Sequence, residues 1–303
     1  MASAKQNPVI RKVLIEQNQG PQTRQNIFVQ LQRELKRTVV SFFTSFTIPV
    51  LIEDADADML EGILQKTDLS NGLALVISSP GGLGLSAERI INICRNYSGT
   101  GDYWVIVPSK AKSAATMICL GASRIIMGPT SELGPIGPQI AVTQDGKAQT
   151  FSLHNIVESY EDLFRRAIHE KGNLEPYLQQ LERYDEREIK KFRSFIALSE
   201  DIVTRALASG MMKGIDKQEI KKKIAIFLKP EETKTHGRPI YAKEASMCGL
   251  QIELKNIKER FWELIYELYI RTNNYVSTKT VKCIESQHHA FGIPIPKVRG
   301  GNE

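Results

Sequence analysis

A regular alternation of short apolar segments with helical ones between residues 73 and 127 constrains the fold of this chain more than any other feature. Apolar runs at 73–77, 103–107 and 124–127 are separated by helical patterns at 85–97 and 113–122. Strands that are separated by helices of about a dozen residues are joined by right-handed crossovers. The pattern therefore predicts a parallel sheet in an α/β protein, and the residues that follow its strands should meet at one edge of that sheet.

The residues after the first two strands can carry acyl-transfer chemistry. Segment 79–82 reads Ser-Pro-Gly-Gly, and segment 112–116 reads Lys-Ser-Ala-Ala-Thr. Each alone is typical of a turn or a helix N-cap, but together at one sheet edge they place free amide donors opposite a hydroxyl. An oxyanion hole that faces a nucleophile is the minimum equipment for acyl transfer. We predict Ser113 as the nucleophile, with oxyanion-binding amides from Gly81, Gly82 and Ala114.

These segments resemble the Clp protease and crotonase superfamily, and within it the chain is similar to the serine dehydrogenase proteinase family, relatives of signal peptide peptidase A. The resemblance rests on segments 79–82 and 111–116, continues through 131–136, and includes a late Glu-Ala…Gly-Leu pattern at 244–250. It implies a crotonase/Clp-protease-like ββα superhelix core with C-terminal helical additions from residue 152 onward. It also implies an intracellular serine peptidase-like hydrolase, not a dehydrogenase, that acts on a peptide or protein substrate and forms a homo-oligomer.

A chain of 303 residues suits one large domain. We expect a flexible N-terminal segment over residues 1–20, the Clp/crotonase-like serine protease domain over 21–285 and a C-terminal tail over 286–303. Strands at 139–143 and 147–151 flank Asp145-Gly146 and predict a hairpin.

Further elements follow from the apolar period and from turn residues. An aspartate, Asp54 or Asp56, should cap a helix that runs to Gln65. A strand is expected at 38–43, and β-like chain at 49–52. Other helices are expected at 22–36, 154–170, 174–209, 216–228, 240–248 and 254–271.

The last of these helices carries apolar residues on nearly two faces. One face of it suffices for the core of the chain, and an aromatic flank beside that face is typical of an interface between copies. The alternative is that the whole helix lies in a groove of its own subunit. The flank consists of Trp262, Tyr266 and Tyr269.

The general base stays open at this stage. His154 begins the first helix after the hairpin, where the resemblance implies that signal-peptide-peptidase-like relatives carry their base lysine. His236 precedes the Glu-Ala…Gly-Leu pattern, and the resemblance implies an active-site member there. Lysine bases are also possible, because Lys147 lies on the hairpin and Lys112 adjoins the serine, although Lys112 should point away along the helix. A catalytic lysine must be desolvated to lower its pKa.

One position departs from the family pattern. Family members usually show Asp-Pro-Gln where this chain has Gly137-Pro138-Gln139, and the stretch after the serine where Clp proteases carry their histidine contains none. If that aspartate orients a base, its loss leaves the base less well held. A second interpretation is therefore a catalytically degenerate protease-fold scaffold or interaction protein. A third is a crotonase-type enzyme acting on an acyl-CoA thioester, which needs the glycine oxyanion hole but no nucleophilic serine.

Composition narrows the remaining classes of protein. The chain is 42% hydrophobic, and its longest apolar stretch, 39–52, is too short to span a bilayer. Its four cysteines form no C-x-x-C pair, which indicates a reduced, cytoplasmic protein without disulfides or a metal site. We predict no cofactor. The net charge of +6 is dispersed among acids except at 213–223, and that cluster is better explained as a surface helix than as a nucleic-acid contact.

Overall fold

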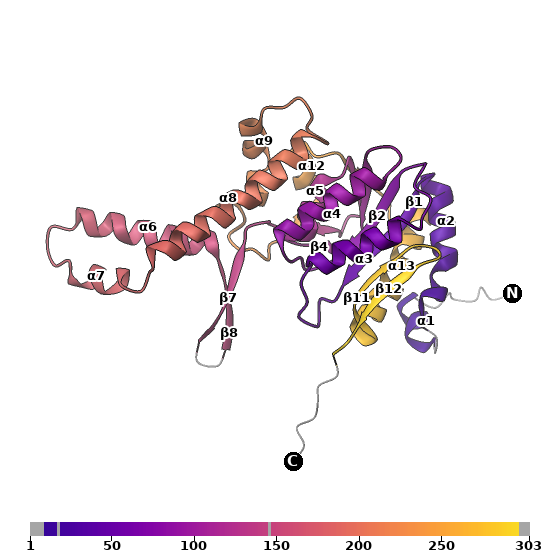
Figure 1. Cartoon of the computed structure of the whole chain (residues 1–303), viewed down its shortest axis with the longest axis horizontal. Helices are drawn as coiled ribbons and strands as arrows, with labels where there is room; N and C mark the ends of the chain where they lie inside the picture. Colours follow the sequence, from indigo (N-terminus) through magenta and orange to yellow (C-terminus); the bar gives the residue numbers. More distant parts are fainter. Residues whose placement is uncertain (1–8, 17–18, 145–146, 297–303) are drawn as a thin grey trace, which may run out of the picture.

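The computed structural model describes residues 9–16, 19–144 and 147–296, and a seven-stranded sheet with the order β10-β5-β3-β2-β1-β11-β12 lies at its centre (Figure 1). Five of its strands run parallel, and β11 and β12 join antiparallel at the β1 edge. The prediction of an α/β fold is confirmed. The strands are β1 (Thr38–Thr44), β2 (Leu73–Ser78), β3 (Tyr103–Val107), β5 (Arg124–Met127), β10 (Ile252–Leu254), β11 (Thr280–Glu285) and β12 (Ala290–Pro294).

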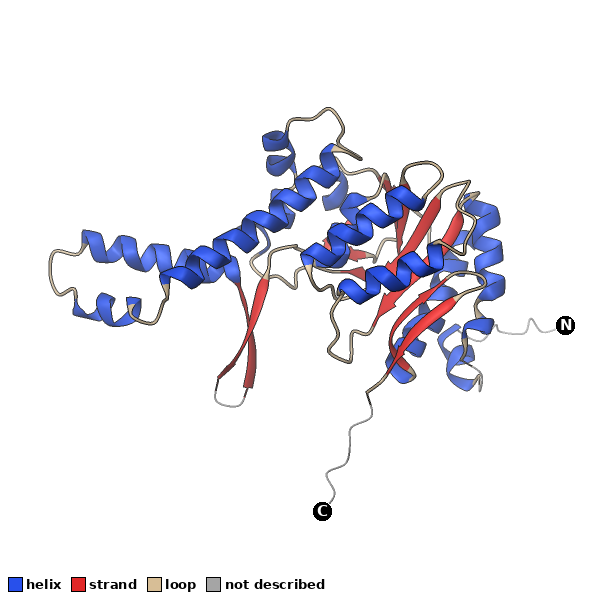
Figure 2. Ribbon diagram, in the orientation of Figure 1, coloured by secondary structure: helices blue, strands red, loops and turns tan. Residues whose placement is uncertain are grey.

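Helices cover both faces of the sheet (Figure 2), so the central strands are buried on both sides. On β2, Leu73, Leu75 and Ile77 enter one apolar core, and Ala74 and Val76 enter the other. This alternation follows from the strand period of two, and burial on both faces explains why the strands read as continuous apolar runs. The first core contains α3 (Asp54–Leu64), α4 (Gly84–Tyr97) and α5 (Ala114–Gly121), and the second contains α2 (Gln25–Leu35) and α13 (Arg260–Thr278).

The cap of α3 differs from the prediction in one respect. Glu53 is the N-cap residue, and Asp56 completes a capping box by accepting the Glu53 backbone N–H at 2.8 Å. Asp56 is fully buried and pairs with the Lys282 ammonium of β11 at 2.8 Å. Burial raises the pKa of the Asp56 carboxyl, and the bond to Lys282 opposes that rise. This ion pair joins β11 to α3.

The ends of the chain contain more regular structure than their composition indicates. Residues Val9–Ile15 form α1 within the segment 1–20 that was expected to be flexible, and β12 lies within the expected C-terminal tail at 286–303. The helix expected at 254–271 begins at Arg260 and runs to Thr278, because residues 252–254 form a strand that pairs with β5.

The aromatic flank of α13 belongs mostly to the interior. Trp262 is 6% exposed, and a Cβ added to Gly128 would lie 2.3 Å from its ring. Tyr269 is half-buried and packs against Phe43, and Tyr266 alone of the three is exposed. The prediction that this flank forms an interface is therefore wrong for Trp262, and the alternative of a groove in its own subunit describes most of the helix.

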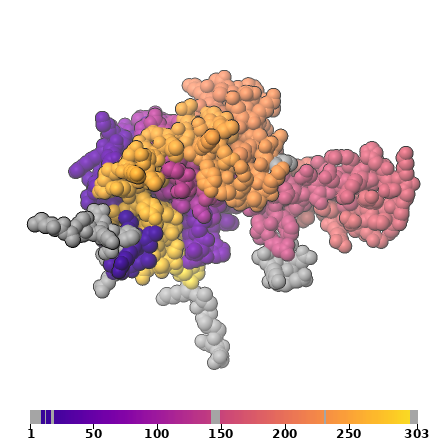
Figure 3. All heavy atoms as spheres, turned by 180° about the vertical axis from the view of Figure 1, so that it is seen from behind, coloured from indigo at the N-terminus to yellow at the C-terminus, as the bar shows by residue number. Residues whose placement is uncertain are grey.

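An arm extends from the core between residues 139 and 208 (Figure 1), and its outer part projects from the rest of the molecule in the view from behind (Figure 3). The single helix expected at 174–209 is two helices, because Asp185 accepts the Arg187 N–H and starts a new one. The predicted hairpin is present, but its turn at Asp145-Gly146 lies outside the described residues. The arm consists of β7 (Gln139–Gln144), β8 (Lys147–Ser152), α6 (Leu153–His169), α7 (Glu175–Leu181) and α8 (Glu186–Ala208).

The remaining elements connect the arm to the last strands of the core. The C-terminal half of α8 packs on α5 and α4. Across the described residues, no helix combines the length and apolarity that a bilayer crossing requires. The connecting elements are α9 (Lys217–Lys223), α10 (Ala225–Leu228), α11 (Pro230–Thr233), β9 (Ile240–Tyr241) and α12 (Ala242–Met247).

Candidate active site

The two segments singled out in the sequence lie against each other. The Ser79 N–H donates to the Lys110 carbonyl at 3.1 Å, and the Lys112 N–H donates to the Ser79 carbonyl at 3.0 Å. These bonds pair Ser79 with Ala111 of β4 (Lys110–Ala111) as a short parallel bridge. The chain that leaves β2 is therefore clamped to the chain that leads into α5, and the adjacency predicted from the strand pattern is confirmed.

Gly81 makes the closest approach between the segments. A Cβ added to Gly81 would lie 2.6 Å from the Lys112 carbonyl oxygen and 2.6 Å from the Ser113 Cβ. Its φ of +107° is also a backbone conformation that L side chains rarely adopt. Glycine is therefore required at position 81 both for space and for conformation.

Ser113 stands in a strained backbone conformation at the start of α5. Its φ is 51° and its ψ is −120°, and the helix begins at the next residue. A non-glycine residue held in such a region costs about 1–3 kcal/mol, and such residues cluster at active sites. The side chain is half-buried, and its carbonyl accepts the Met117 N–H at 3.1 Å. The surrounding contacts thus hold a serine at a sharp turn before a buried helix.

The amide of Gly82 is directed by the peptide to which it belongs. The Gly81 carbonyl accepts the Ile52 N–H at 2.8 Å, and Leu83 donates to the Ile52 carbonyl at 2.8 Å. In a trans peptide the N–H points opposite to the C=O, so the Gly82 N–H points away from Ile52. Within the described part of the chain we find no acceptor for it.

The other two predicted donors differ from each other. Ala114 is the first residue of α5, and the first amides of a helix have no acceptor within it. The Gly81 N–H, in contrast, donates to the Ser79 side-chain hydroxyl at 3.1 Å. The amides of Gly82 and Ala114 are therefore the ones left for a ligand.

A cavity of about 510 Å³ opens over these groups. Ser113, Gly81, Gly82 and His236 all line it. The sequence does not predict that the arm also lines this cavity, although the apolar period of α8 can be read from it. The arm and loop residues that line the cavity are Leu51, Pro138, Gln139, Ile140, Leu153, Phe192, Phe195, Leu198, Ser199 and Ile202.

His236 reaches the cavity through a small sheet. Its loop precedes β9, which pairs with β6 (Glu132–Leu133), and β6 pairs with β4 beside Ser113. Burial lowers the pKa of the His236 imidazole, and the positive charges of Lys112 and His154 lower it further. The neutral imidazole, which can accept a proton, is thereby favoured.

His154 lies behind this position, at the start of α6. A Cβ added to Gly137 would lie 3.3 Å from its Cδ2 atom, so the ring packs where the family pattern has aspartate. His154 is close enough to His236 to influence its pKa. The two candidate histidines therefore belong to one region, with His236 on the cavity wall.

The lysine alternatives are less well placed for catalysis. The Lys112 ammonium pairs with Glu132 at 2.8 Å and donates to the Leu133 carbonyl at 3.0 Å. Its charge is thus held against β6, in agreement with the expectation that it points away from the serine hydroxyl. The side chain of Lys147 lies outside what the structure describes.

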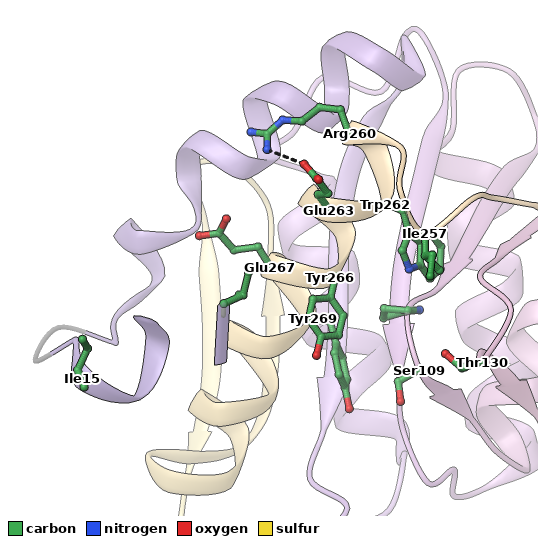
Figure 4. Close-up of a pocket in the computed structure, with 12 residues that line it drawn as sticks. Ile15, Ser109, Thr130, Ile257, Arg260, Trp262, Glu263, Tyr266, Glu267 and Tyr269 are labelled. Atoms are coloured by element: carbon green, nitrogen blue, oxygen red, sulfur yellow. Dashed lines mark hydrogen bonds and ion pairs between the residues drawn. The ribbon is translucent and has the colours of Figure 1, made fainter. Parts of the chain in front are cut away.

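A larger cavity of about 800 Å³ lies beside α13 and contains none of the predicted site residues (Figure 4). Trp262, Tyr266 and Tyr269 form its aromatic side, and Ser109 and Thr130 lie opposite.

Among the described residues, no group of three or more His, Cys, Asp or Glu side chains could hold a metal ion.

Comparison with known proteins finds similarity in the part of the chain that contains Ser113 and the glycine pair. Residues 9–159, which include Ser113 and the glycine pair, match the ClpP-like SDH-type serine proteinases. Two uncharacterized proteins of Methanocaldococcus jannaschii are also similar. MJ0137 is 26% identical over 236 residues, which cover 74% of this chain and 68% of the relative. MJ1495 is 27% identical over 220 residues, which cover 73% of this chain and 64% of the relative, slightly less than two thirds of its length.

Replacement of Gly81 by alanine should disrupt the site because the new methyl group would meet the Lys112 carbonyl and Ser113 at 2.6 Å. We expect a loss of unfolding free energy of more than about 2 kcal/mol, measured by urea denaturation. Gly214→Ala is the matched control, since Gly214 also has a positive φ, of 88°, but nothing lies within 4 Å of an added Cβ. The control should lose about 1 kcal/mol from backbone strain alone. Equal losses in the two variants would contradict the close approach.

Proposed function

Because residues 9–159 belong to the ClpP-like SDH-type serine proteinases, we propose that this protein is a serine peptidase-like hydrolase that cleaves peptide bonds through an acyl-enzyme on Ser113. The observation that carries the proposal is the strained turn at Ser113, packed directly against Gly81. A strained backbone conformation persists only where the surrounding contacts hold it in place, and such conformations cluster at active sites.

The first half of the reaction forms the acyl-enzyme. The Ser113 hydroxyl oxygen attacks the carbonyl carbon of the substrate while a base accepts its proton. The tetrahedral oxyanion would be bound by the amides of Gly82 and Ala114, and each well-placed donor contributes about 3–4 kcal/mol. The intermediate collapses when the C–N bond breaks and the leaving amine takes the proton from the base. In the second half, water attacks the ester, and the same base moves the proton from water to Ser113.

His236 is the proposed base. It lines the same cavity as Ser113, and its lowered pKa favours the neutral imidazole at neutral pH. His154 is proposed as a neighbour of the base and not as the base itself. It packs against Gly137, and its positive charge lowers the pKa of His236. A histidine in this place gives His236 a polar neighbour although the chain lacks an aspartate at position 137.

The cavity supports an extended peptide with apolar side chains as the substrate. Leu51, Leu83, Leu85 and Phe195 are all exposed, and all line this one cavity. Exposed apolar groups gathered at one place mark a binding site. The chain at 79–84 on one side and β7 on the other offer backbone groups to a strand laid between them.

A catalytically degenerate scaffold remains the second candidate, and Gly137 is the observation that favours it. Its lack of a side chain removes the carboxylate that could hold a histidine in one orientation.

We also propose a cytoplasmic location, because the four cysteines are free and buried.

Self-association is proposed from the arm and not from α13. Phe164, Ile168 and Leu178 on α6 and α7 are between 48% and 64% exposed, on a part of the chain that stands clear of the core. Apolar side chains on a projecting element are typical of a contact surface between copies.

Ser113→Ala should abolish hydrolysis and labelling by a fluorophosphonate probe without unfolding the chain, because the half-buried hydroxyl has little structural role. His236→Ala should lower the labelling rate by orders of magnitude, and His154→Ala by less. Mass spectrometry of the labelled protein locates the probe. A protein that carries no label at Ser113 would favour the scaffold, and full activity in Ser113→Ala would remove the serine from the mechanism.

The pH profile of kcat/KM should report the charge on His236. Because its pKa lies below the ordinary 6.5, the acid limb should also lie below that value. Lys112→Gln removes a positive charge that disfavours the imidazolium, so the pKa of His236 should rise and the limb should move to higher pH. Lys110→Gln, at an exposed position two residues away, is the control and should leave the limb in place. An unchanged limb in Lys112→Gln would argue against His236 as the base.

Light scattering at micromolar concentration should give a closed multiple of the 34.1 kDa chain mass. Ile168→Glu on the arm should shift the mass toward that of one chain, because a charge would enter the contact. Met247→Glu, at a residue that is 79% exposed on α12, should leave the assembly intact. A mass near 34.1 kDa for the unmodified protein would end the assembly proposal.

A further inference from the structure

Two buried hydroxyl side chains lie under the glycine pair. The Thr44 hydroxyl, at the end of β1, donates to the Ser79 Oγ at 2.7 Å. The same Oγ accepts the Gly81 backbone N–H at 3.1 Å. Thr44 is 1% exposed and Ser79 is fully buried, so water does not compete for these bonds. A chain of hydrogen bonds thus runs from the neighbouring strand to the Gly81 amide.

This chain fixes one of the two peptide planes that meet at Gly81. The plane after Gly81 is held by the Ile52 N–H, which donates to the Gly81 carbonyl. The plane before Gly81 is held by Ser79 Oγ. Glycine is the residue with the widest backbone freedom, so a glycine with a φ of +107° keeps one orientation only if both planes are held. The direction of the Gly82 N–H depends on both.

We propose that Ser79 is a positioning residue for the oxyanion-binding amide of Gly82, and that Thr44 acts through Ser79. The inference rests on the proposed function, since it assigns the amide to the oxyanion. Ser79 and Thr44 are buried and neither lines the cavity, so neither touches a substrate. Their effect is on the rate of the chemical step and not on binding of the ground state.

Thr44 has a separate part in this arrangement. A serine hydroxyl in a buried site can turn between staggered rotamers, and only one of them places Oγ next to the Gly81 amide. The bond from Thr44 favours that rotamer, because any other would leave the Thr44 hydroxyl buried and unpaired. Removal of the Thr44 hydroxyl alone should therefore loosen the glycine pair while Ser79 stays present.

The kinetic test compares Thr44→Val with Thr44→Ser, which keeps the hydroxyl, and with Ser79→Ala. Loss of one oxyanion donor costs about 100-fold or more in kcat, and a misdirected donor should cost about tenfold. We expect Thr44→Val and Ser79→Ala to lower kcat and the rate of fluorophosphonate labelling about tenfold with KM changed less than about twofold, and Thr44→Ser to restore both rates. Thr204→Val is the matched control, because Thr204 is also 1% exposed but its hydroxyl bonds within α8. Wild-type rates in Thr44→Val, or equal losses in Thr204→Val, would overturn the proposal.

A second measurement does not depend on activity. In protein labelled with ¹⁵N-glycine, the amide signals of Gly81 and Gly82 should shift in Thr44→Val, and the Gly81 amide, which is bonded to Ser79 Oγ, should exchange faster with solvent. Both effects should be reversed in Thr44→Ser. Unchanged signals would overturn the positioning role whatever the kinetics. If the unmodified protein neither reacts with the probe nor cleaves peptides while these amides respond, the proposed function fails and the positioning of Gly82 by Ser79 stands.

Discussion

The short parallel bridge between Ser79 and Ala111 is the contact on which the rest of the site depends. Two backbone bonds, from Ser79 to Lys110 and from Lys112 to Ser79, join the residue that follows β2 to the short strand β4 that leads into α5. Because of them, Gly81 lies against Ser113 with no room for a Cβ. The bridge thus brings the strained turn at Ser113 and the glycine pair to the same place.

The sequence predicts the parallel core well because several signals agree there. Strands 103–107 and 124–127 are observed with their expected bounds, since each is buried and ends at small or turn-forming residues. The break between α7 and α8 escapes the pattern, because Asp185 reads as one more polar residue on a charged helix face until its side chain is seen to cap Arg187. The strand β11 escapes it because β11 pairs with β1, near the opposite end of the chain, and β12 enters the sheet only through its pairing with β11.

Some residues of the candidate site can likewise be predicted from local motifs, and others cannot. Ser113 and Gly82 follow from local motifs, whereas the place of His236 depends on the pairing of β9 with β6, which no local pattern encodes. The use of the Gly81 amide by Ser79 is also invisible in sequence, since Ser-Pro-Gly-Gly does not say which amide is already bonded. The contribution of α8 to the cavity could be inferred only in part, because an apolar stripe does not name what it packs against.

Helix α8 connects the outer arm to the cavity as one mechanical element. It has 23 residues, which gives a length of about 35 Å. Its C-terminal half packs on α5, Phe192 and Phe195 line the cavity, and its beginning lies beside α6. Because α8 is one continuous helix, Phe192 and Phe195 at the cavity belong to the same rigid element that carries the outer arm.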